Sequence, residues 1–157
     1  MNARVGIGYD SHRFAEPAEG RPLILGGVTI PHDRGLAGHS DADVLTHAVI
    51  DALLGACGQG DIGTHFPPDS EQWAGADSLD LLRRTLEILE GTPVNVDATV
   101  IGEQPRLSGH REEIQDSLSA ALGAPVSVKA TTNEGMGWIG RGEGLACTAV
   151  ALVERQA

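Results

Sequence analysis

The stretch GLACTAVALVE, residues 144–154, is apolar at nearly every position from Leu145 to Val153. A strand with one face in water alternates apolar and polar residues, whereas a strand covered on both faces is a continuous apolar run. We therefore expect a strand in a sheet whose two faces are both covered, with helices of the same chain on one of them. In a chain of 157 residues, further copies of the chain are the expected cover of the other face. The run thus predicts an oligomer.

Hydrophobic periodicity predicts the order strand, hairpin, helix, long loop, helix, strand, helix, strand, strand. The first strand is expected at VGIGYDSHRF, where Val5, Ile7 and Tyr9 alternate with glycines and are expected in the core. The helices are expected within 42–57, 78–90 and 108–123, and the long loop between the first two. We expect one α+β domain over residues 1–157, a two-layer sandwich with a mixed β-sheet and helices packed on one face.

The charge balance limits the kinds of ligand this chain can bind. The formal net charge is −11, which argues against a nucleic acid or an anionic membrane as partner. A phosphate ligand would need bound cations to neutralise it. No apolar run approaches the roughly 20 residues of a membrane span. Both cysteines, Cys57 and Cys147, lie in apolar contexts and are expected to be reduced core thiols. We expect a cytoplasmic protein.

A set of candidate metal ligands combines the first strand with the first helix. Asp10 and His12 are two residues apart, so they point to one side of a strand. Asp43, His47 and Asp51 follow at intervals of four and share one side of a helix, which a solvated face would also explain. Together with His47, Asp10 and His12 make a set of two histidines and one carboxylate. Zinc takes such ligands and keeps a fourth position open.

Other polar segments suit the binding of an anion, although each has a simpler explanation. GHSDAD is expected to place His39 and Ser40 at a helix N-terminus, where backbone N–H groups attract phosphate. KATTNEG is either a group of hydrogen-bond donors beside a carboxylate or a polar strand end whose residues form a turn. GRGEG is a phosphate-binding loop or a flexible connector. Asp61 in GDIG is a turn residue or a carboxylate for a sugar hydroxyl.

Together these segments resemble the 2-C-methyl-D-erythritol 2,4-cyclodiphosphate synthase family. The resemblance is carried, in order along the chain, by GYDSHRF, LILGGVTIP, GHSDADVLTHAVIDALLGA, GDIGTHFP, VKATTNEGMGWIGRGEG and ACTAVAL. It implies that Asp10, His12 and His47 bind Zn²⁺, and that Glu134 binds a second cation, Mg²⁺ or Mn²⁺, on the substrate diphosphate. It implies His39 and Thr132 as catalytic residues. The substrate-binding residues it implies are Asp10, His12, His39, Ser40, Asp61, Ile62, Gly63, Thr131, Thr132, Asn133, Glu134, Trp138 and Arg141.

The resemblance also implies a reaction and an assembly. The 2-phosphate of 4-diphosphocytidyl-2-C-methyl-D-erythritol 2-phosphate attacks the β-phosphorus, which gives the cyclic diphosphate and releases CMP. The segment 102–108, GEQPRLS, would receive the cytidine. The family is a homotrimer with active sites between subunits. Arg141 and Glu143 would lie either in the active site or along the trimer axis. No nucleic acid or membrane partner is expected.

Two other functions use the same residues. A metal-dependent phosphohydrolase would use zinc-bound water as nucleophile, and would hydrolyse simple phosphate esters without a cyclic product. A non-catalytic trimer with a structural metal would close the fourth coordination position and would have little use for the polar groups of 129–143. Open-site ligands together with candidate phosphate donors disfavour both.

Overall fold

A computed structural model describes residues 2–155, and its centre is a four-stranded mixed sheet in the order β1-β6-β4-β5. The strands are β1 (Ala3–Arg13), β4 (Thr92–Ile101), β5 (Val126–Thr131) and β6 (Gly144–Glu154). β6 pairs antiparallel with β1 and β4, whereas β4 and β5 are parallel. A separate two-stranded hairpin consists of β2 (Leu23–Leu25) and β3 (Val28–Ile30). The predicted mixed sheet is confirmed.

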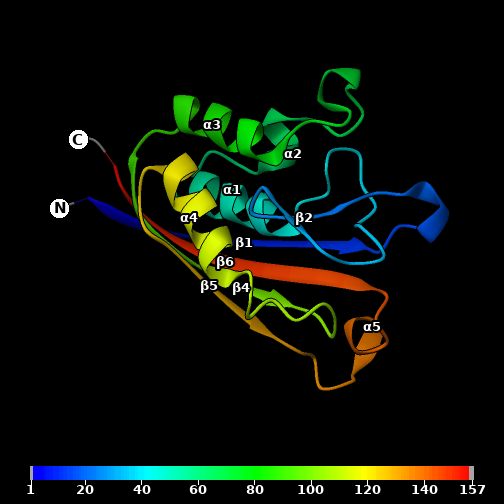
Figure 1. Ribbon diagram of the computed structural model, residues 1–157. Coiled ribbons are helices and arrows are strands. Elements are labelled where there is room, and N and C mark those ends of the chain that lie inside the picture. Colours follow the sequence, from blue (N-terminus) through cyan, green and yellow to red (C-terminus); the bar gives the residue numbers. More distant parts are fainter. Residues whose placement is uncertain (1, 156–157) are drawn as a thin grey trace.

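Three long helices lie on one side of this sheet (Figure 1). They are α1 (Val44–Cys57), α3 (Ser78–Ile88) and α4 (Arg111–Leu122). The expected long loop contains the short α2 (Ile62–His65) and the 3₁₀ turn η2 (Glu71–Trp73). A second 3₁₀ turn, η1 (Pro17–Glu19), precedes the hairpin, and α5 (Gly137–Gly140) lies in the expected connector before β6. None of the helices within 2–155 is long and apolar enough to cross a membrane.

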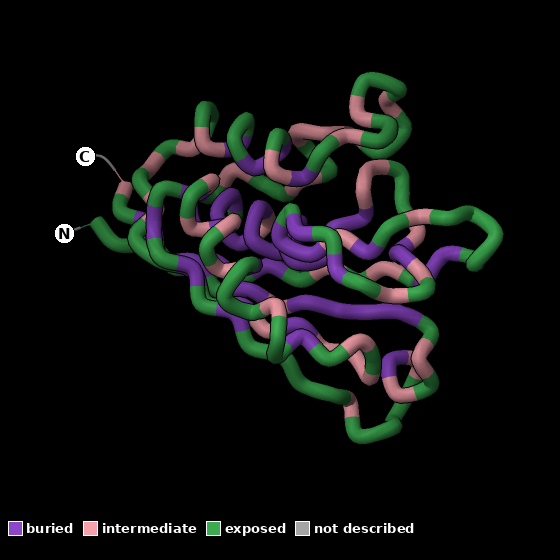
Figure 2. The backbone as a smooth tube through the Cα atoms, viewed as in Figure 1, coloured by how far each residue is buried: buried purple, intermediate pink, exposed green. Residues whose placement is uncertain are grey.

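The apolar run predicts that both faces of β6 are covered, but in a single chain the two faces differ in burial. On the helix side Cys147, Ala149 and Val153 are fully or almost fully buried in the main core. Figure 2 shows most of β6 as buried. On the other side Val150 is 44% exposed, and it pairs with Ile7 of β1. Within one chain, therefore, only the helix side of the sheet is fully covered.

The face of β1 that meets the core is the opposite of the predicted one. Val5, Ile7 and Tyr9 are 68%, 72% and 57% exposed, and so the expectation that they are buried is wrong for a single chain. Gly6 and Gly8 face α1 instead. A Cβ on either glycine would lie 1.9 Å from a carbonyl oxygen of α1, because the helix rests directly on the strand backbone. Asp10 and His12 continue this inward face towards α1.

The N-terminus of α1 is held by Asp43, which is completely buried. The prediction that Asp43 lies on a solvated helix face is therefore wrong. The helix α1 begins at Val44, so His39 and Ser40 precede its N-terminus and do not form it. The Asp43 oxygens accept five hydrogen bonds, from Gly26 N, Gly27 N, Thr46 N, Thr46 Oγ1 and Ser78 Oγ. Buried carboxylates are stable when their lone pairs are satisfied in this way. Asp43 thus joins the hairpin turn, α1 and α3.

Candidate active site

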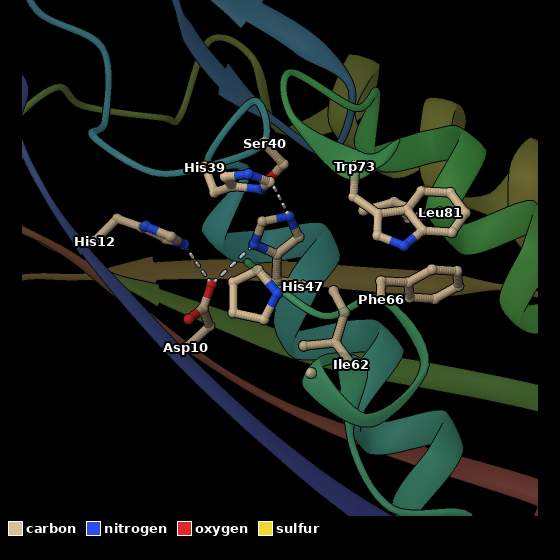
Figure 3. Close-up of a pocket in the computed structure, with 11 residues that line it drawn as sticks. Asp10, His12, His39, Ser40, His47, Ile62, Phe66, Trp73 and Leu81 are labelled. Carbon is tan, nitrogen blue, oxygen red and sulfur yellow. Dashed lines mark hydrogen bonds and ion pairs between the residues drawn. The ribbon is translucent and has the colours of Figure 1, made fainter. Parts of the chain in front are cut away.

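Three side chains from β1 and α1 meet at one point. Asp10 and His12 come from the inward face of β1, and His47 from the first turn of α1. One ligand atom from each lies within 4.8 Å of the other two, and residues 2–155 contain no other such group of three histidine, cysteine or acidic residues. Asp10 Oδ2 is 2.8 Å from His12 Nε2 and 3.1 Å from His47 Nδ1 (Figure 3). The predicted convergence is confirmed.

Hydrogen bonds set the tautomer of His12 in a way that suits a metal ligand. His12 Nδ1 lies 2.8 Å from the carbonyl of Ala37, so Nδ1 carries the proton and donates it. Nε2 then keeps a lone pair. This nitrogen is buried and has no hydrogen-bond partner, although it lies against Asp10. A buried nitrogen lone pair aimed at a carboxylate is what a divalent cation would satisfy.

The ring of His47 is also fixed on its far side. His47 Nε2 lies 3.2 Å from Ser40 Oγ and 3.9 Å from Asp41 Oδ1, while Nδ1 faces Asp10. With Nε2 protonated, the ring donates towards Ser40 and offers the Nδ1 lone pair to a shared ion. The donor set therefore fits Zn²⁺ or a similar ion.

Interactions among the three side chains shift the pKa values of Asp10 and His12. Burial works to raise the pKa of Asp10, but the electrostatic interactions with His12 and His47 outweigh it and bring the pKa to about 2. Burial works to lower the pKa of His12, and the neighbouring Asp10 carboxylate reverses this, so the pKa of His12 is raised. Asp10 is thus ionised at neutral pH, the state a metal ligand requires.

A cavity of about 210 Å³ opens beside the three ligands. Its polar part contains the predicted His39 and Ser40 with the ligands themselves. The rest of the lining is Ile62, Gly63, Phe66, Pro68, Trp73 and Leu81 (Figure 3). Within the predicted GDIG segment, Ile62 and Gly63 line this cavity, whereas Asp61 does not.

The aromatic wall of this cavity is not among the residues predicted from the sequence. The rings of Phe66 and Trp73 meet edge to face, with centroids 5.0 Å apart. The chain has only two Phe, two Trp and one Tyr. Two of these five in a Gly- and Pro-rich loop were a usable signal, because a solvated loop has little reason to carry large apolar rings.

Two aspartates hold α2 in place at the cavity. Asp61 caps α2, and its carboxylate accepts hydrogen bonds from Thr64 N and Thr64 Oγ1, both at 2.8 Å. Asp51 of α1 accepts from Ile62 N at 2.7 Å, so it ties α2 to α1 instead of belonging to a solvated face. These contacts fix the edge of the cavity that Ile62 and Gly63 form.

The predicted threonines lie in a different cavity, of about 460 Å³. It forms where the parallel strands β4 and β5 end side by side, since Ile101 pairs with Thr131. Thr131 and Thr132 line it together with residues 102–108, Ala130 and Arg111. The parallel pairing thus brings the predicted cytidine segment next to the threonines, and this cavity shares no lining residue with the first.

The remaining predicted residues lie elsewhere. Asn133 and Glu134 are in the turn after β5, and Glu134 is exposed. Trp138 lines a third hollow of about 250 Å³, with His12 and others. The exposed Arg141 lies 3.4 Å from Glu143. A single chain therefore distributes the predicted site over several surfaces.

Known proteins resemble this chain over nearly its whole length. The YgbB family model matches residues 3–154. A 2-C-methyl-D-erythritol 2,4-cyclodiphosphate synthase from Rubrobacter xylanophilus is 58% identical, over 97% of this chain and 95% of that protein.

Two solved structures have the same fold. The CDP complex of IspF from Plasmodium falciparum has a TM-score of 0.82 at 34% identity, covering 100% of this chain and 99% of that one. The bifunctional IspDF from Campylobacter jejuni has a TM-score of 0.91 at 36% identity. It covers 98% of this chain, which spans 42% of that longer one. The chain belongs to the YgbB family.

Proposed function

We propose that this chain converts 4-diphosphocytidyl-2-C-methyl-D-erythritol 2-phosphate to 2-C-methyl-D-erythritol 2,4-cyclodiphosphate and CMP. The observation that carries the proposal is the convergence of Asp10, His12 and His47 beside a cavity, in a chain 58% identical to a synthase of that name. In this reaction an oxygen of the 2-phosphate bonds to the β-phosphorus. The bond from that phosphorus to the bridging oxygen breaks, and CMP leaves with the electron pair. This is a phosphorus–oxygen lyase reaction.

Asp10, His12 and His47 would hold Zn²⁺, which supplies positive charge to the β-phosphate. Glu134, an exposed carboxylate, is the proposed ligand of a second cation, Mg²⁺ or Mn²⁺, on the diphosphate. Bound cations explain how a chain of net charge −11 accepts a polyanion.

The other proposed residues act by position. His39 and Ser40, beside the three ligands, orient the reacting phosphate, and the hydroxyl of Thr132 donates to an oxygen that gains charge in the transition state. Asp61, Ile62 and Gly63 are proposed contacts of the methylerythritol and ribose. The other proposed contacts are Thr131, Asn133, Trp138 and Arg141. The protein needs no nucleophile of its own, because the attacking oxygen belongs to the substrate.

We also propose a homotrimer in which each site is completed by a neighbouring chain, with residues 1–157 acting as one cyclodiphosphate synthase domain. The exposed Val5, Ile7, Tyr9 and Val150 give the open sheet face an apolar surface of the kind that subunits bury. The separation of the metal ligands from Thr132 within one chain supports the same arrangement. The phosphohydrolase alternative has no support among the relatives.

The direct test is to incubate the purified protein with this substrate, Zn²⁺ and Mg²⁺, and to follow the products by phosphorus NMR and chromatography. We expect one CMP for each cyclic diphosphate formed. Release of CMP with only a linear product would contradict the proposal. His47→Ala should lose both zinc and activity, whereas the matched surface variant Glu87→Ala, on the exposed side of α3, should retain both.

A further inference from the structure

The second cavity contains a carboxylate whose role the proposed function leaves open. Glu103 follows β4, and its side chain reaches the turn that follows β5. Its Oε1 accepts hydrogen bonds from Asn133 N at 3.0 Å and from Gly135 N at 3.3 Å. One oxygen of Glu103 therefore connects the two loops that form the cavity.

The turn that Glu103 holds has an uncommon backbone conformation. Glu134, between the two donors, has φ of +52°, in the left-handed region that side chains other than glycine seldom adopt. Backbone N–H groups around such a residue form a concavity that binds anions. The Glu103 carboxylate occupies it, and one of its oxygens accepts both hydrogen bonds. The turn closes with a hydrogen bond from Met136 N to Asn133 O, at 3.0 Å.

The same turn orients the hydroxyl of Thr132. Glu134 N donates to Thr132 Oγ1 at 3.2 Å, which occupies one acceptor position of that oxygen. The hydroxyl proton remains available to donate to a ligand in the cavity that Thr132 lines. Displacement of Glu134 N would release the Thr132 side chain to other rotamers.

We propose that Glu103 is a positioning residue: by holding the 133–135 turn it fixes Glu134 N, and through it the direction in which Thr132 donates its proton. The inference rests on the proposed function, because it assigns Thr132 a phosphate oxygen as its partner. Glu103 itself does not touch the reacting atoms. A carboxylate in a cavity for a polyanion is otherwise unfavourable, and a role in the turn accounts for its presence.

The test compares Glu103→Ala with Glu103→Gln, and uses Glu87→Ala as a control that removes a carboxylate from a distant exposed site. Glutamine keeps an oxygen at the same reach but removes the charge. We expect Glu103→Ala to lower kcat about 10- to 100-fold with KM changed less than about threefold. We expect Glu103→Gln to stay within about threefold of wild type for both constants. Amide hydrogen exchange at Asn133 and Gly135 should accelerate in Glu103→Ala and much less in Glu103→Gln.

The outcomes are distinguishable. Equal losses in the alanine and glutamine variants would mean that charge alone matters, and would overturn the inference. It would also be overturned if Glu103→Ala kept full kcat or unchanged amide exchange. Zinc content should stay at the wild-type level in all variants, and its loss would show general misfolding instead of a local effect, which also contradicts the inference. If the wild-type protein makes no cyclic product, the proposed function has failed, and amide exchange still decides whether Glu103 holds the turn.

Discussion

The two cavities are built in different ways. The ligands Asp10, His12 and His47 lie between β1 and α1, where the helix rests on the strand backbone and both histidine rings have partners on their far sides. Thr131, Thr132 and Glu134 are exposed, and they lie at the end of β5 and in the turn that follows it. The metal ligands are thus positioned by the core of a single chain. The substrate-handling groups are positioned by local hydrogen bonds and, in our proposal, by a neighbouring chain.

The largest effect is expected where the first cavity depends on close packing. Gly8→Ala would place a Cβ 1.9 Å from the carbonyl oxygen of Ala48, the residue after His47. Moving α1 away should lower the free energy of unfolding by about 3 kcal/mol. It should also weaken zinc binding by about 10- to 100-fold, because His47 moves away from Asp10. Urea denaturation and a zinc titration measure these two quantities.

The matched control for this change is Gly109→Ala. The added Cβ at Gly109 meets no atom within 4 Å, so both quantities should stay close to wild type. If Gly8→Ala behaved like Gly109→Ala, the metal ligands would not depend on the contact between α1 and β1.

A second variant should separate zinc binding at the first cavity from catalysis, which in our proposal needs both cavities. Ile7→Glu puts a charge on the open sheet face, where Ile7 is 72% exposed in one chain. If that face is buried between copies, the charge should prevent assembly, since an unpaired charge in an apolar interface is strongly unfavourable. Light scattering should then show a monomer that still binds zinc but makes no cyclic product. An unchanged trimer with full activity would place the interface elsewhere.

The last prediction concerns pH and the first cavity alone. Metal binding needs the unprotonated Nε2 of His12, whose pKa is raised above its ordinary value by Asp10 against the effect of burial. The apparent zinc affinity should therefore fall as the pH drops below this raised pKa, by up to about tenfold for each pH unit. Asp10, with a pKa of about 2, remains ionised throughout that range. Titrations from pH 8 to pH 5 measure this, and a constant affinity would contradict the assignment of His12.

Much of the fold could be predicted from the sequence because its periodicities are strong. The apolar run of 145–153 predicted a covered strand, which the structure confirms on the helix side of β6. The ligand chemistry of Asp10, His12 and His47 indicated a shared ion, and the structure brings the three side chains together. Periodicity could not say which face of β1 is inward. An alternation of glycine with large apolar residues fits a helix packed on the glycines as well as a core packed on the side chains.

The position of the α1 N-terminus also escaped prediction. Ser40, Asp41 and Asp43 are all good N-cap residues, and the choice of Asp43 depends on donors from distant segments, such as Gly27 and Ser78. The exposed loop groups are harder still, because their contacts involve partners far away in sequence. Glu103, which is 30 residues from Asn133, is one example.

In the proposed trimer, one active site combines the metal ligands of one chain with Thr132 of another. The most direct test is to co-express His47→Ala and Thr132→Ala chains with different affinity tags, and to purify assemblies that carry both tags. Each variant alone should be almost inactive. The mixed assemblies should regain a substantial part of the wild-type rate of cyclic diphosphate formation, because some sites then combine two unaltered halves. Mixed assemblies as inactive as either variant alone would contradict a site shared between two chains.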